Sequence, residues 1–194
     1  MKRFAPVALS TGLMLTGALS AAPAAAQETY SLDARHTFPA FEVRHFGMST
    51  QRGLFNKTTG KVTVDLAAKK GSADIAIDMA SVVTGDLKLI DHLRNEDFFD
   101  VAKYPTSTFK SSGFTFEGDK LVAVSGDLTL HGVTNPVTLA VHAFNCAPHP
   151  MSKKAMCGAD ASVTIKRSDF GISKYIPAIG DDVKLSIPVE AYRD

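Results

Sequence analysis

Hydrophobic and polar residues alternate through most of this 194-residue chain. Alternation with a period of two is typical of strands that have one apolar face and one face in water, as in antiparallel sheets. The alternating stretches are residues 41–45, 62–66, 73–79, 122–130, 137–141, 161–165 and 183–189. The pattern predicts an all-β fold of about eight or more antiparallel strands, closed as a barrel or stacked as a sandwich.

Residues 86–96 break this alternation. Their hydrophobic side chains, Leu87, Ile90 and Leu93, recur at helical spacing, and Thr84 or Asp86 is placed to cap the start. The segment therefore predicts one short helix that packs over one end of the sheet.

The side of each strand that faces inward carries both large and small residues. The large ones are Phe41, Phe55, Ile75, Ile77 and Phe109, and the small ones are Gly53, Ala73, Gly126, Ala161 and Ala191. An eight-stranded barrel is wide enough to hold one small ligand when its interior is not filled. Small residues either leave a cavity or make room for the phenyl rings opposite, and composition does not decide between the two.

Residues 1–26 have the layout of a secretory signal peptide. A basic start at Lys2 and Arg3 precedes a short apolar run, which ends in an A-x-A pattern at Ala26. The apolar run is shorter than the roughly 20 residues that a spanning helix needs, so stable membrane insertion is not expected. The sequence thus predicts a periplasmic protein whose folded domain is residues 27–194.

Charge and cysteine content limit the classes of partner and cofactor that this protein is expected to bind. Removal of the signal would leave 19 basic and 20 acidic residues, which argues against electrostatic binding of nucleic acid. Cys146 and Cys157 predict one disulfide in an oxidising compartment. A redox pair lacks the C-x-x-C spacing, and a metal site with His149 lacks a fourth ligand, so neither a metal nor a cofactor is expected.

The order and spacing of several short motifs resemble the YceI-like family of bacterial, often periplasmic, lipid-binding proteins. The motifs are 31–37 (SLDARHT), 41–50 (FEVRHFGMST), 52–55 (RGLF), 92–101 (HLRNEDFFDV), 104–109 (YPTSTF), 126–134 (GDLTLHGVT), 167–171 (RSDFG) and 180–185 (GDDVKL). The resemblance covers residues 29–192. It implies an extended antiparallel β-barrel of lipocalin-like shape, and no catalytic activity.

The resemblance also implies a hydrophobic ligand inside the barrel, such as a polyprenyl lipid, a prenylated quinone or a fatty amide. The inward positions that we expect to line it are Phe41, Val43, Phe55, Ile75, Ile77, Phe109, Leu128, Val163 and Leu185. His45 shares their parity and is expected near the polar head of the ligand, with a core or rim histidine as the alternative. The oligomeric state stays open, with a homodimer as one alternative.

Other polar residues have structural interpretations. His36 is expected to fix a turn with Asp33. Arg167 and Asp169 are expected to pair and so hold the loop 172–180 in place. The apolar residues of this loop indicate either a flap that covers a cavity or a surface that contacts a partner.

The sequence is compatible with two further classes of function. An interaction protein with a filled barrel would present this flap or the disulfide loop to a partner. An enzyme acting on lipids would need His36 or His45 at its site, and the common hydrolase and metalloprotease motifs are missing from the sequence.

Overall fold

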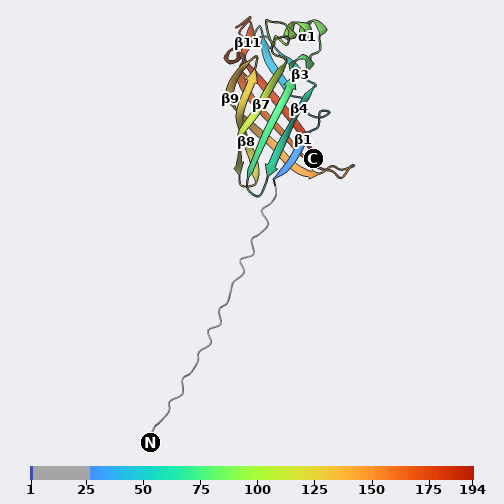
Figure 1. Cartoon of the computed structure of the whole chain (residues 1–194). Helices are drawn as coiled ribbons and strands as arrows, with labels where there is room; N and C mark the ends of the chain where they lie inside the picture. The colour runs from blue at the N-terminus through green and yellow to red at the C-terminus, as the bar shows by residue number, and fades with distance from the viewer. Residues whose placement is uncertain (2–26) are drawn as a thin grey trace.

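The computed structural model describes Met1 and residues 27–194, so the predicted signal peptide lies outside the described residues. The described part of the chain forms one α-helix and eleven β-strands (Figure 1). The strands are β1 (Glu28–Leu32), β2 (Ala40–His45), β3 (Ser49–Phe55), β4 (Thr58–Asp65), β5 (Lys70–Asp78), β6 (Val82–Val83), β7 (Thr106–Glu117), β8 (Lys120–Leu130), β9 (Val133–Pro148), β10 (Ala155–Lys166) and β11 (Ile179–Arg193).

The strands close into an antiparallel barrel. Neighbours follow the order β1-β4-β5-β7-β8-β9-β10-β11, and β11 returns to β1 to close the ring. Eight strands therefore form the closed ring, and no strand in it is left with an open edge. The prediction of an all-β, lipocalin-like barrel of about eight strands with one short helix is confirmed.

The three remaining strands lengthen the barrel at one end. β11 pairs with β1 through Ala191–Arg193 and with β2 through residues nearer its start, such as Leu185. β3 then pairs with β2, and β6 pairs with β3. Each of the segments β1 to β2, β3 to β4 and β5 to β6 is therefore one strand path with a break. These breaks could not be seen in the alternation, because the inward residues resume after each of them.

The single α-helix of the described chain, α1 (Leu87–Arg94), lies over this extended end of the barrel (Figure 1). Asp86 caps it by accepting a hydrogen bond from the Lys88 N–H, as one of the two sequence alternatives predicted. Ile90 and Leu93 are buried against the barrel core. Leu87 was also expected on the buried face but is 79% exposed. It is the first helical residue, so its side chain points toward the N-terminal end of the helix and past the barrel wall.

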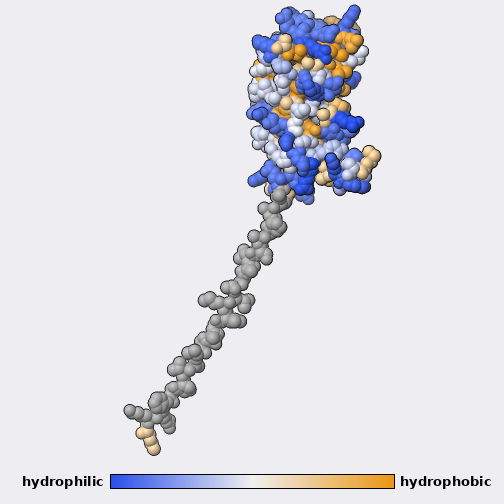
Figure 2. Space-filling view, turned by 45° about the vertical axis from the view of Figure 1, so that its right-hand side comes forward, coloured by the Kyte–Doolittle hydropathy of each residue, from blue (hydrophilic) through white to orange (hydrophobic). Residues whose placement is uncertain are grey.

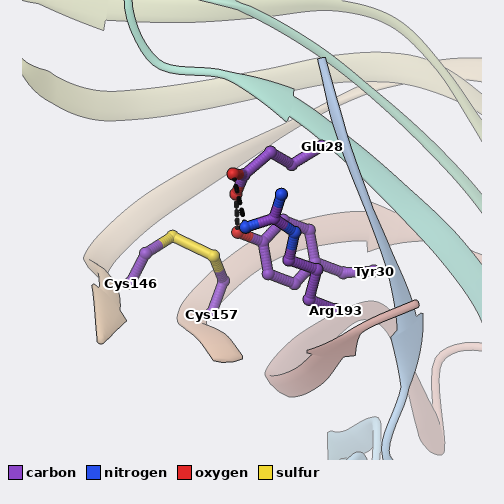
Figure 3. The surroundings of a disulfide bond; sticks show 5 residues. All are labelled: Glu28, Tyr30, Cys146, Cys157 and Arg193. Carbon is purple, nitrogen blue, oxygen red and sulfur yellow. Dashed lines mark hydrogen bonds and ion pairs between the residues drawn. A yellow bond between two sulfur atoms is a disulfide. The ribbon is translucent and has the colours of Figure 1, made fainter. Parts of the chain in front are cut away.

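The far end of the barrel carries the predicted disulfide (Figure 3). Cys146 on β9 and Cys157 on β10 are directly opposite each other in the strand register. Cys157 packs with Tyr30 and Ala191 in a small buried cluster. The Tyr30 hydroxyl donates to Glu28, and burial together with this hydrogen bond raises the pKa of Tyr30 to about 12.

We expect the disulfide to stabilise the barrel by restricting the unfolded chain. Closing a loop of about 12 residues contributes roughly 3 kcal/mol in the chain-entropy model. The double substitution Cys146→Ala, Cys157→Ala should lower the free energy of unfolding by about this amount in urea denaturation. Repeating both measurements with a thiol reductant is the control, because the difference should then shrink. Equal stability without reductant would contradict the prediction.

The outer surface is mixed in polarity. Figure 2 shows hydrophilic residues gathered at both ends of the barrel, with smaller hydrophobic areas along its side. Among the residues that the structure describes, none of the helical segments has the length and apolar character to cross a membrane.

Candidate functional site

The interior of the barrel holds a cavity of about 250 Å³. For comparison, an engineered apolar cavity of roughly 150 Å³ stays dry and takes up benzene. Nine of the ten residues that the sequence predicted to line a ligand do line this cavity. They are Phe41, Val43, Phe55, Ile75, Ile77, Phe109, Leu128, Val163 and Leu185.

Many inward side chains are not fully covered by their neighbours. Ile75, Ile77, Val163 and Leu185 all face inward yet are only partly buried. The exposed part of an inward aliphatic side chain is surface that faces the cavity. A filled barrel, one of the alternatives left open by composition, does not fit this hollow interior.

Some of the small inward residues make room for phenyl rings, and others leave space in the cavity. A Cβ atom on Gly53 would lie 2.4 Å from the ring of Phe41, and one on Gly126 would lie 2.6 Å from the ring of Phe109. These two glycines therefore make room for phenyl rings. Ala73 and Ala161 instead line the cavity itself and leave space in it.

His45 is the one residue of the ten that does not line the cavity. β2 ends at His45, and the chain turns at Phe46 and Gly47, which both have positive φ. The His45 ring packs against Phe46, with 4.2 Å between the ring centroids. Strand parity gave the correct side, but the strand ends at the rim, so the alternative of a rim histidine holds.

Four polar side chains in the cavity wall were not predicted as site residues. They are Thr37, Thr58, Ser107 and Arg167, and each of them is buried. Thr58 shares the inward parity of Val62 and Val64 on β4, and Ser107 shares that of Phe109 on β7. That parity was the signal in the sequence that could have identified these two.

Arg167 connects the cavity wall to the loop between η2 (Arg167–Phe170) and β11. Its guanidinium donates to the carbonyl oxygens of Ile172 (2.8 Å), Gly180 (2.9 Å), Lys174 (2.9 Å) and Ile179 (3.0 Å). Arg167 is only 5% exposed, and this burial lowers the pKa of its guanidinium.

The expected pairing of Arg167 with Asp169 is therefore wrong. A single guanidinium bonds four backbone carbonyls of the flap instead, because the loop folds back around it. The carboxylate that braces this turn is Asp181, which accepts from the N–H and the hydroxyl of Ser168 at 2.9 Å and 2.8 Å.

A second contact fastens the flap to the segment that follows α1. The Tyr175 hydroxyl donates to Asp97 Oδ2 at 2.6 Å, and Lys174 Nζ lies 3.6 Å from Asp97 Oδ1. The hydrogen bond from Tyr175 holds the pKa of Asp97 below its usual range. The adjacent Phe98 lines the cavity, as does Ile172 of the flap, so both segments cover the same end of it.

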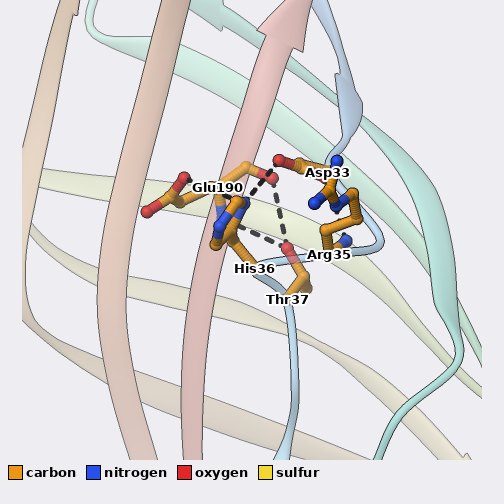
Figure 4. A network of polar contacts seen from close by, with 5 residues as sticks. All are labelled: Asp33, Arg35, His36, Thr37 and Glu190. Carbon is orange, nitrogen blue, oxygen red and sulfur yellow. Dashed lines mark hydrogen bonds and ion pairs between the residues drawn. The ribbon is translucent and has the colours of Figure 1, made fainter. Parts of the chain in front are cut away.

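The turn between β1 and β2 carries a polar cluster (Figure 4). His36 Nδ1 lies 2.7 Å from Asp33 Oδ2 and 3.8 Å from Glu190 Oε2, while Thr37 Oγ1 donates to the Glu190 carbonyl. The expectation that His36 fixes this turn with Asp33 agrees with these contacts. Within residues 27–194, Asp33, His36 and Glu190 form the group whose ligand atoms lie close enough together to hold a metal ion. Their contacts with one another already account for this arrangement.

We expect the His36–Asp33 contact to make stability depend on pH. The hydrogen bond with Asp33 raises the pKa of His36, and the same bond lowers the pKa of Asp33. The histidine contribution is fully present below about pH 6.5 and is lost as pH rises through the raised folded value. The aspartate contribution is present above about pH 3.9 and is lost as pH falls through the lowered folded value.

The stability difference between wild type and His36→Gln should therefore be largest near pH 5 and shrink toward pH 8. Urea denaturation midpoints across this range measure it. His142→Gln is a matched control, since the ring of His142 contacts the Ser162 hydroxyl and no carboxylate. A difference that stayed constant with pH would contradict the prediction.

Fold and site together define a closed eight-stranded antiparallel barrel that encloses an apolar cavity. The family model described as a YceI-like domain matches residues 30–191. The chain therefore belongs to the YceI-like family, and the resemblance inferred from its motifs is confirmed.

Curated relatives match over nearly their full length. The UPF0312 protein of Pseudomonas aeruginosa strain LESB58 is 34% identical over 197 aligned residues, which cover 99% of this chain and 98% of that protein. Protein YceI of Escherichia coli O157:H7 is 35% identical over 184 residues, covering 92% and 94%.

Solved structures show the same fold. BcnA of Burkholderia cenocepacia superposes with a TM-score of 0.71 and 28% identity, over 82% of this chain and 99% of that one. The Campylobacter jejuni YCEI protein gives a TM-score of 0.67, also at 28% identity, over 78% and 90%. A polyisoprenoid binding domain from Saccharophagus degradans gives 0.63 at 21% identity, over 85% and 98%, which shows likeness of fold alone.

Proposed function

We propose that this protein binds and carries an amphiphilic isoprenoid lipid in its cavity. The candidate ligands are a polyprenyl lipid, a prenylated quinone or a fatty amide. The observation that carries the proposal is the cavity of about 250 Å³ inside the barrel, whose wall consists mostly of aliphatic and aromatic side chains. A polyisoprenoid binding domain with the same fold supports it.

The free energy for such binding comes from burial of the chain. Each buried methylene contributes about 0.8 kcal/mol, so eight to ten of them exceed 6 kcal/mol. Ordering the ligand opposes this with several kcal/mol. A few polar groups in an otherwise apolar wall are enough to orient the head of the ligand.

Binding is favoured over catalysis by the position of the histidines. Neither His36 nor His45 lines the cavity, so neither is placed to act as a base on a ligand inside it. The guanidinium of Arg167 is occupied by flap carbonyls. An enzyme acting on lipids would need a reactive group at the wall.

The periplasm is the proposed site of action. The signal-like layout of residues 1–26 supports export, and a disulfide is the expected state of two paired cysteines outside the cytoplasm. Fractionation of host cells, followed by immunodetection of the mature chain, tests this location.

The ligand can be identified on protein purified without detergent from the periplasm of its own host. Organic extraction followed by mass spectrometry should show one defined prenyl or acyl species, near one molecule per chain. An empty extract, and a second empty extract after incubation with host membranes, would overturn the proposal.

A further inference from the structure

Two separate segments cover the end of the cavity that lies opposite the disulfide. Phe98 and Phe99, from the segment that follows α1, line the cavity there. Ile172 and Ile179 of the flap line it as well. The line along which the two segments meet is called the seam below.

Each of these segments has its own anchor in the rest of the fold. The Phe99 N–H donates to the Leu93 carbonyl at 3.0 Å, which holds the segment after α1 against the end of the helix. The flap is held by Arg167, whose guanidinium bonds to its carbonyl oxygens. Because neither anchor crosses the seam, the seam can open without unfolding either segment.

A polar recess lies on the outer side of the seam. Its wall consists of Glu96, Asp97, Phe98, His131, Gly171, Ile172, Ser173 and Lys174. Phe98 and Ile172 line both this recess and the cavity. These two side chains, one from each segment, therefore form the partition between the cavity and the surface at the seam.

The polar contacts across the seam converge on one carboxylate. The Tyr175 hydroxyl donates to Asp97 Oδ2 at 2.6 Å, and Lys174 Nζ lies 3.6 Å from Asp97 Oδ1. Within the described part of the chain, no other hydrogen bond or ion pair joins residues 95–105 to residues 172–178. The ring of Tyr175 also lies beside that of Phe98, with 5.9 Å between the centroids. Asp97 and Tyr175 thus hold the seam closed.

The contact between these two residues is of a kind that is readily released. Tyr175 has a φ of +63°, in the left-handed region that is unfavourable for a residue with a Cβ atom. Its side chain is partly exposed, and polar pairs at the surface contribute little to stability. The closed position of the flap tip therefore depends on a weak contact.

We propose that lipid enters and leaves the cavity through the seam, and that the contact between Asp97 and Tyr175 is its latch. This inference rests on the proposed function and adds the route that the ligand takes. Opening the seam parts Phe98 from Ile172 and joins the cavity to the recess. Because the latch is closed in both the empty and the loaded protein, loosening it changes the rates of uptake and release and leaves the affinity unchanged.

The test measures how fast the apolar dye N-phenyl-1-naphthylamine enters and leaves the mature chain. Stopped-flow mixing of dye with lipid-free protein gives uptake, and mixing of loaded protein with excess farnesol gives release. Tyr175→Phe removes the hydroxyl of the latch, and Asp97→Ala removes the carboxylate. Glu28→Ala is the matched control, because Glu28 accepts from the Tyr30 hydroxyl and pairs with Arg193 at the disulfide end.

Tyr175→Phe and Asp97→Ala should each speed uptake and release by the same factor, about fivefold, with an unchanged dissociation constant. Glu28→Ala should leave both rates at the wild-type values. The thermal midpoint of Tyr175→Phe should stay close to that of wild type, since the lost contact is at the surface. Faster exchange in this variant would then come from the seam and not from a generally loosened barrel.

Unchanged rates in both latch variants would overturn the seam as the entrance and leave the proposed function intact. Faster release alone, with weaker dye binding, would make Tyr175 and Asp97 supports of the bound molecule and overturn their role as a latch. Equal acceleration by Glu28→Ala would also overturn it. Wild-type protein from which farnesol does not displace the dye would overturn the proposed function, and this inference with it.

Discussion

The variant Ala161→Phe is expected to lose prenyl-lipid binding while it keeps the barrel fold. Ala161 lines the cavity and lies between Val141 on β9 and Ile187 on β11 in the strand register. A phenyl ring there would occupy the space that the ligand chain needs. Displacing three methylenes removes about 2.4 kcal/mol of burial, which corresponds to roughly fiftyfold weaker binding.

Folding should survive this change because the added ring enters empty space. Overpacking destabilises cores that are already filled, whereas this ring gains apolar contacts in a cavity. Displacement of the apolar dye N-phenyl-1-naphthylamine by farnesol, a prenyl alcohol, measures binding, and thermal melting measures stability. Ala140→Phe is the matched control, since Ala140 is an exposed residue of β9 next to Val141. Unchanged farnesol affinity in Ala161→Phe would place the ligand outside the cavity.

The cavity wall could be predicted from sequence because strand parity is a local property. Once Phe41, Ile75 or Leu185 is assigned to a strand, the inward side follows from alternation. The same rule failed for His45, because parity tells which side a residue faces and not where the strand leaves the cavity. The end of β2 is set by the turn at Phe46 and Gly47, which pairs the strand with β3.

Whether the barrel is hollow depends on contacts between strands, which sequence does not display. Gly53 lies beneath the ring of Phe41 because the two residues are opposite each other in the β2–β3 register. Ala161 has aliphatic neighbours in the register and stays open to the cavity. Both are small inward residues, and only the pairing separates them.

The partners of Arg167 could not be inferred either. The sequence offered Asp169, two residues away, as an opposite charge, but the loop after η2 folds back and presents four carbonyl oxygens. Hydrogen bonds to backbone carbonyls leave no signal in residue types. The apolar composition of residues 173–179 predicted either a flap that covers a cavity or a contact surface for a partner. Ile172 and Ile179 do line the cavity.

The variant Arg167→Met is expected to destabilise the protein by about 3 kcal/mol, because four flap carbonyls lose their donor and each hydrogen bond contributes roughly 0.5–1.5 kcal/mol. Relief from burying a guanidinium opposes this loss, but leaving several carbonyls unpaired outweighs it. The thermal midpoint should fall by about 6–12 °C for a domain of this size.

Arg167→Lys should recover only part of the loss, because an ammonium group lacks the planar fork that reaches several carbonyls at once. Lys166→Met is the matched control. Lys166 precedes Arg167 in sequence, but its side chain is exposed and pairs with Asp182 at the surface, so removing it should change the thermal midpoint little. Hydrogen exchange should locate the effect of Arg167→Met in residues 172–180. A variant as stable as wild type, with unchanged exchange there, would mean that water replaces the guanidinium and that contacts such as Tyr175 to Asp97 hold the flap instead.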